Sequence, residues 1–200
     1  MTVSTIGVAD AAVVDKYLHT NQRTISSTAR EDQYVLPGQS ANATYSVSVG
    51  DTSVGTTDDH VIQIMGDGSN YSRIERIDLF GSTVTTKNNL VLALYRLSSA
   101  GTGGTSVTPA PFDTADTYAG GAMTLPSSKG TEGTRLLTVV IHLDVQSAGR
   151  SGDWTWTTPI GSKPIIFGPA TSSGVALKVI AGRAGGYIDA NVIFTTTTYL

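Results

Sequence analysis

The chain has 200 residues, which is enough to bury a core as one domain of ordinary size. Its formal net charge is −3 and its 13 Lys and Arg residues are scattered singly, so the composition excludes a basic face for nucleic acid. It contains no cysteine, which excludes disulfides, thiolate zinc sites and cysteine nucleophiles together.

Residues 1–32 are predicted to form an extended N-terminal arm. Apolar side chains recur between Ile6 and Leu18 with Asp10 as a candidate N-cap, so a short helix and an extended segment are both open there. Residues 19–32 are polar and show no period. A terminal segment of this kind is ordered only where a partner or the protein's own body holds it.

Strand patterns begin near Gln33 and define a second domain, residues 33–200. Residues 43–49 alternate apolar and polar side chains, as half-buried strands do. Residues 66–70, Gly-Asp-Gly-Ser-Asn, are expected to form a turn, because Asp-Gly tolerates positive φ. The apolar phase shifts between Ile74 and Ile77, which predicts a β-bulge near Glu75. The predicted strands are 33–36, 43–49, 60–65, 72–80, 90–97, 136–144, 154–157, 164–167, 175–181 and 187–196.

About ten strands and at most one short helix predict an all-β fold, an antiparallel β-sandwich or jelly roll. Residues 98–133 interrupt the strand pattern with a segment rich in Gly, Ser, Thr, Ala and Pro, which is expected to be a long loop. A loop of this length in a compact domain is usually functional or is ordered by a neighbour.

The sequence offers no cluster of reactive side chains at a catalytic spacing, so we expect no enzyme, no cofactor and no metal. Asp58, Asp59 and His60 are adjacent, but no second cluster supplies further metal ligands, so they are expected at the solvated start of a strand. His142 is expected on the exposed face of its strand.

Charges of opposite sign alternate along the predicted strand 72–80, which predicts a ladder of surface ion pairs. Trp154 and Trp156 lie two residues apart, so on a strand they share one face. An exposed pair could stack on a sugar ring, whereas a buried pair would fill the core or a subunit interface.

Several stretches resemble one class of protein. They are Val13-Val14-Asp15-Lys16-Tyr17-Leu18-His19-Thr20, residues 89–96, residues 103–109 with 112–116, and Pro164-Ile165-Ile166-Phe167-Gly168. Across most of its length the chain resembles the β-sandwich virion proteins of tailed bacteriophages, among them head decoration (cement) proteins.

The resemblance implies a structural virion protein that binds the major capsid protein, stabilises the head and has no catalytic residues. It implies that the protein forms a homotrimer. It also implies that the protein is made in the host cytoplasm and is located on the capsid surface. The arm would then act in assembly, with the candidate residues Val13, Val14, Asp15, Tyr17, Leu18 and His19.

The alternative function is a carbohydrate- or receptor-binding module of a phage fibre or tail, with Trp154 and Trp156 as its candidate residues. Neither nucleic acid nor a membrane is an expected partner. No apolar run approaches the ~18 residues of a membrane span, and the N-terminus lacks the pattern of a signal peptide.

Overall fold

The computed structural model describes residues 3–10, 13–25, 28–34, 42–54, 59–83, 88–143, 152–181 and 186–197. The chain divides into two compact units, residues 1–41 and 42–200. All the regular elements in these described ranges are β-strands, which confirms the all-β prediction. Those ranges contain no helix long and apolar enough to cross a membrane.

The first unit contains β1 (Val3–Asp10), β2 (Val13–Ile25) and β3 (Thr28–Tyr34), which form an antiparallel sheet with β2 in the middle. The register pairs Ile6 with Leu18, and His19 with both Thr5 and Tyr34. Of the two alternatives for residues 6–18, the described backbone is therefore extended rather than helical. All six candidate assembly residues, 13–15 and 17–19, lie on β2, and their role stays a prediction.

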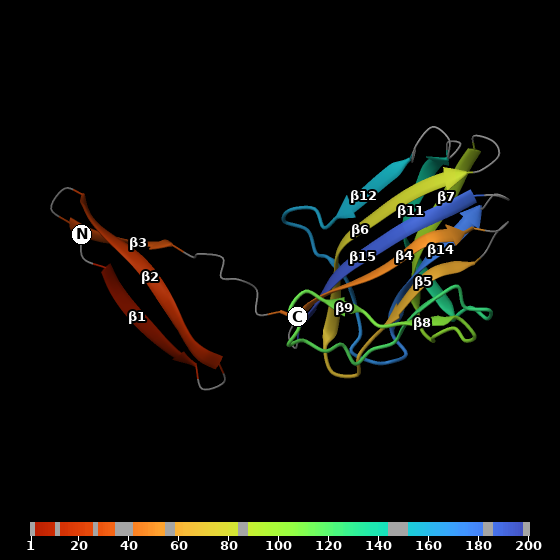
Figure 1. The fold of residues 1–200 in the computed structure, drawn as a ribbon. Coiled ribbons are helices and arrows are strands. Elements are labelled where there is room, and N and C mark those ends of the chain that lie inside the picture. The colour runs from red at the N-terminus through yellow and green to blue at the C-terminus, as the bar shows by residue number, and fades with distance from the viewer. Residues whose placement is uncertain are drawn as a thin grey trace. The chain divides into compact units, whose positions relative to one another are not determined.

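The second unit is a sandwich of two antiparallel sheets, which confirms the predicted architecture (Figure 1). Sheet I has the order β11-β7-β14-β5-β10-β8. Its strands are β5 (His60–Met65), β7 (Asn88–Leu97), β8 (Thr105–Val107), β10 (Ala122–Thr124), β11 (Glu132–Leu143) and β14 (Gly174–Ala181).

Sheet II has the order β12-β6-β15-β4-β9, and β13 also pairs with β6. Its strands are β4 (Thr44–Ser53), β6 (Tyr71–Thr83), β9 (Ala110–Pro111), β12 (Asp153–Thr157), β13 (Ile165–Phe167) and β15 (Gly186–Thr197).

Nine of the predicted strands match β4–β7 and β11–β15, with ends displaced by a few residues. The loop expected at 98–133 instead contributes three short strands, β8, β9 and β10. They exist because β5 and β4 offer them partners: β10 pairs with both β5 and β8, and β9 pairs with β4.

The core lies between the sheets, because alternate residues of each strand face inward. Val139, Ile141 and Leu143 of β11 are buried while the residues between them are exposed. At one end of the core the rings of Tyr45, Tyr118 and Phe194 pack together, with centroids 5.0–5.5 Å apart.

The predicted bulge lies at Glu75. On one side of β6, Ile193 pairs with Arg76 and Phe194 with Ile74, so Glu75 is the extra residue of β6. On the other side β12 pairs with residues 76–80 and β13 with residues 72–74. The bulge is thus the point at which β6 exchanges one neighbour for another, and it leaves both Glu75 and Arg76 on the outer face of sheet II.

The predicted turn at 66–70 carries the chain from β5 in sheet I to β6 in sheet II. The Asp67 carboxylate accepts hydrogen bonds from the backbone N–H groups of Ser69 (2.8 Å) and Asn70 (2.6 Å) and from Asn70 Nδ2 (2.7 Å). Gly68 has φ +89°, as the Asp-Gly pair predicts. Burial by itself raises the pKa of Asp67, but the hydrogen bonds from Asn70 and Ser69 outweigh it and lower the pKa below its ordinary value.

Candidate functional site

The outer face of sheet I is covered over β5 and β14, where it contains buried polar side chains. His60 and Gln63 of β5 are both fully buried, and Lys178 of β14 is 8% exposed. Gly101 and Glu132, near the two ends of the segment 98–133, bond to these side chains. The segment 98–133 therefore folds back onto this face of the sheet.

The expectation that His60 lies at a solvated start of a strand is wrong. Asp59 is exposed as expected, but His60 is buried, because β5 has a neighbour on each side and the segment 98–133 on its outer face. Asp58 lies outside the described residues. His142 does lie on the exposed face of β11, where its Nδ1 is 2.6 Å from Asn89 Oδ1.

A single chain of hydrogen bonds joins the buried groups. The backbone N–H of Gly101 donates to Gln63 Oε1 (2.8 Å), and Gln63 Nε2 lies 2.5 Å from His60 Nδ1. His60 Nε2 lies 3.0 Å from Glu132 Oε1. The ammonium group of Lys178 donates to both carboxylate oxygens of Glu132, each at 2.8 Å. We call these five residues the relay.

The contacts fix the protonation state of the relay. Burial lowers the pKa of His60, although Glu132 opposes this effect, so the ring is neutral at pH 7. Burial by itself raises the pKa of Glu132, but hydrogen bonds from Lys178 and His60 outweigh this effect and lower the pKa below its ordinary value. The side chain is therefore a carboxylate. His60 Nε2–H consequently donates to Glu132, and His60 Nδ1 accepts a hydrogen bond from Gln63.

The relay does not form a usable catalytic centre. A carboxylate and a histidine are placed as in the orienting half of a hydrolytic triad. However, Gln63 occupies the second ring nitrogen of His60, and the imidazole is fully buried, so a substrate cannot reach it. No group of three or more His, Cys, Asp or Glu side chains that could hold a metal ion occurs among the described residues.

The outer face of sheet II is open to solvent and carries a ladder of side-chain hydrogen bonds across four strands. Arg73 pairs with Glu75 at 3.0 Å and Arg76 with Asp78 at 2.8 Å, which confirms the predicted ion pairs of β6. The rungs to neighbouring strands are Thr195 Oγ1 to Glu75 (2.8 Å), Thr155 Oγ1 to Asp78 (2.8 Å) and Ser48 Oγ to Asn191 (2.8 Å).

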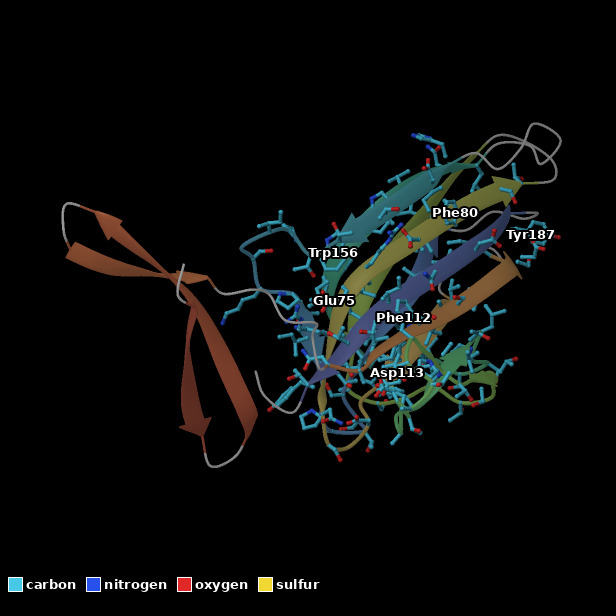
Figure 2. The ribbon with its side chains drawn as sticks, turned by 60° about the vertical axis from the view of Figure 1, so that its left-hand side comes forward. Glu75, Phe80, Phe112, Asp113, Trp156 and Tyr187 are labelled. Atoms are coloured by element: carbon cyan, nitrogen blue, oxygen red, sulfur yellow. The ribbon has the colours of Figure 1, made fainter. Side chains whose placement is uncertain are left out.

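Two aromatic side chains lie toward one end of this open face. Phe80 on β6 is 38% exposed, and Tyr187 on β15 is half-buried. Asp189 is directly opposite Phe80 in the register and two residues from Tyr187, so the three share the outer face. Figure 2 labels both rings at the same end of β6 and β15.

Trp154 and Trp156 lie on β12, the edge strand of sheet II, and share one face as their spacing predicts. Both indoles are half-buried and pack against the core cluster (Figure 2 labels Trp156). Each thus shields the edge of the core and keeps part of its surface in solvent. Their role in sugar binding or in a subunit interface stays a prediction.

Sequence patterns point to parts of the relay but not to its connections. Gln63 interrupts the apolar strand His-Val-Ile-Gln-Ile-Met, and Lys178 interrupts Val-Ala-Leu-Lys-Val-Ile-Ala. A polar residue within a strand that is apolar on both faces is a signal of a buried hydrogen-bonding partner. The partner of Lys178 is Glu132, which also bonds to His60. Glu132 is 46 residues from Lys178 and 72 residues from His60 in the chain, and no local pattern predicts contacts over such separations.

Comparison of the chain with protein-family models, with curated proteins and with solved structures finds no match to any of them.

Proposed function

We propose that the chain is a structural protein of a tailed-bacteriophage particle, a decoration (cement) subunit that binds the major capsid protein on the head. The proposal rests on the sequence resemblance described above and on one observation, the open face of sheet II. This face is polar and pre-ordered, and its charged groups pair with one another.

A decoration subunit must add contact area across the joints of a shell and remain soluble before it binds. A face built from Ser, Thr, Asn and paired charges suits wet, hydrogen-bonded contacts. A polar surface of this kind is less prone to aggregation than a large exposed apolar patch. Because the rungs are already formed, few side chains lose freedom when a partner binds.

The first unit supports the same proposal. Three strands within 41 residues are at the lower limit of what can be stable without packing on something else. In our proposal residues 13–19 on β2 contact the capsid or a neighbouring copy in a homotrimer on the capsid surface.

Particle association is the primary test. An antibody against the chain is used to label particles from a lysate of the encoding phage, and label spread regularly over the head is the expected result. Label confined to the tail tip would replace the decoration role with a receptor-binding one. Absence of label from particles would refute both virion roles.

A pair of substitutions tests the face itself. Asn191→Arg, on β15 in the middle of sheet II, should reduce cosedimentation of the purified protein with heads at least about tenfold, the effect of ~1.4 kcal/mol of binding energy. The matched control is Thr134→Arg on β11, an exposed position of sheet I, which should bind as the unchanged protein does. Equal binding by both variants would exclude the open face as the contact surface.

A second candidate function is carbohydrate binding, as in a fibre or tail module, and the pair Phe80 and Tyr187 beside Asp189 favours it. Aromatic faces stack on sugar rings and carboxylates accept hydrogen bonds from hydroxyl groups. On a glycan array, Phe80→Ala should then abolish a signal that Phe112→Ala, at a 65% exposed ring, leaves unchanged. Loss of signal in Trp154→Ala instead would assign the site to the indole pair.

A further inference from the structure

The segment 98–133 is attached to sheet I near both of its ends through one imidazole ring. Gly101 is held by Gln63 on the Nδ1 side of His60, and Glu132 is held on the Nε2 side. The two ends of the segment also meet each other, since Thr102 and Ser128 exchange backbone hydrogen bonds of 2.9 and 3.1 Å. A change at His60 therefore reaches Gly101 through Gln63 and reaches Glu132 directly, while β10 and β9 stay paired with β5 and β4.

The fit at Gly101 is close. A methyl group at this position would lie 2.5 Å from the carbonyl oxygen of Ser128 and 2.8 Å from Gln63 Nε2. Gly101 therefore packs against Ser128 and Gln63 without room for a side chain of its own.

We propose that the relay is a proton-operated clasp: the neutral His60 ring holds Gly101, near the start of the segment 98–133, on the outer face of sheet I, and a second proton on that ring releases Gly101. This inference does not depend on the proposed virion role. The argument is a count of donors and acceptors.

Neutral His60 has one N–H and one lone pair, and the relay uses both. A proton added at Nδ1 turns the acceptor into a donor, which then faces the NH₂ group of Gln63. Rotation of the Gln63 amide would turn its oxygen toward His60 but would turn its NH₂ group toward the N–H of Gly101. In neither orientation does the amide oxygen face both His60 and Gly101. With the oxygen turned toward protonated His60 the stronger, charge-assisted bond is made and the bond at Gly101 is lost.

Charged groups face the ring from several elements. Glu132 favours protonation of His60, while Lys178 from β14 and Lys129 from the segment itself oppose it. Lys129 Nζ lies 3.9 Å from Glu132 Oε1, and Lys178 Nζ lies 5.2 Å from the ring centroid of Tyr95 on β7. Burial is the largest effect and lowers the pKa of His60 below the ordinary 6.5, so the clasp is closed at neutral pH.

The test follows the amide of Gly101 by hydrogen exchange in the full-length protein, with rates corrected for the intrinsic pH dependence of exchange. As pH falls below 6.5, the protection factor should fall about tenfold per pH unit until the lower pKa of closed-state His60 is reached. In His60→Gln the protection should be independent of pH between 7.5 and 5. The control His142→Gln, at an exposed histidine that also contacts an amide side chain, should behave as the unchanged protein does.

A second variant, Gln63→Glu, should prevent the loss of Gly101 protection in acid. In Gln63→Glu the new carboxylate can accept from Gly101 and from protonated His60 at once, so Gly101 should remain protected down to pH 5. The same variant should raise the pKa of His60 in an NMR titration. The clasp is refuted if Gly101 protection in the unchanged protein is constant from pH 7.5 to 5, or if Gln63→Glu loses protection in acid as the unchanged protein does.

Discussion

The two outer faces of the sandwich use the same polar chemistry in opposite surroundings. On sheet II the glutamate Glu75 binds Arg73 and Thr195, and on sheet I the glutamate Glu132 binds Lys178 and His60. The two glutamates are almost equally exposed, at 28% and 22%. Their partners differ: the side chain of Arg73 is 40% exposed, whereas the side chain of Lys178 is 10% exposed and that of His60 is fully buried.

This difference shows that the contribution of a polar contact to the free energy of unfolding depends on where its partner lies. The cost of losing the contact is larger when the remaining group is buried. A solvated arginine that loses its partner binds water instead. A buried ammonium group or imidazole that loses a partner cannot replace it with water. The open ladder should therefore be adjustable by mutation, while the relay should not.

Removal of the two glutamates tests the comparison most strongly. Glu132→Ala should lower the free energy of unfolding by about 2–4 kcal/mol, because it removes the carboxylate that bonds to two buried side chains, Lys178 and His60. Glu75→Ala should lower it by only about 0–1 kcal/mol. Urea denaturation at pH 7.5 measures both, and equal losses would show that the burial of the partners does not matter.

The packing of the covering segment gives the next largest effect. Gly101→Ala places a methyl group 2.5 Å from Ser128 O and should cost about 1–3 kcal/mol through overpacking. The control is Gly121→Ala, where an added methyl group meets nothing within 4 Å and should change the unfolding free energy by less than about 0.5 kcal/mol. A thermal melt of the two variants beside the unchanged protein separates them.

The turn between the sheets should contribute less. Asp67→Ala removes three hydrogen bonds at a partly solvated site and should cost about 1 kcal/mol. Because the folded-state pKa of Asp67 lies below 3.8, its contribution is present above that pH and is lost as pH falls through the lower folded value. The stability difference between Asp67→Ala and the unchanged protein should therefore shrink below about pH 4. Asp67→Asn, which keeps an acceptor oxygen, should lose less at pH 7.

The smallest effect is expected on the open ladder. Arg73→Ala should cost about 0–0.5 kcal/mol, since Thr195 still donates to Glu75 and the arginine is largely solvated. The loss should disappear in ~1 M salt, where the Debye length is about 3 Å. A loss above about 1.5 kcal/mol that persists in salt would mean that the open face is as tightly coupled as the covered one.

The sandwich was predictable because its signals are local. Alternation along residues 43–49 and 136–144 defined strands with a buried face, and the phase shift between Ile74 and Ile77 located the bulge at Glu75. The strands β8, β9 and β10 were not predictable, because they have two or three residues each and exist only where other strands pair with them. His60 was misplaced for the same reason: its burial comes from a segment that returns to it 40–70 residues later.

The order of the strands determines when, during synthesis of the chain, the two sheets can be completed. β15 lies between β6 and β4 in the middle of sheet II, and β14 lies between β7 and β5 in the middle of sheet I. Residues 174–197 thus complete both sheets from the inside. During synthesis at roughly 5–20 residues per second, the preceding strands wait for several seconds as unpaired edges. A chain that stops before residue 197 lacks part or all of the central strand β15, so only ribosomes that have passed that point release a polypeptide with both sheets complete.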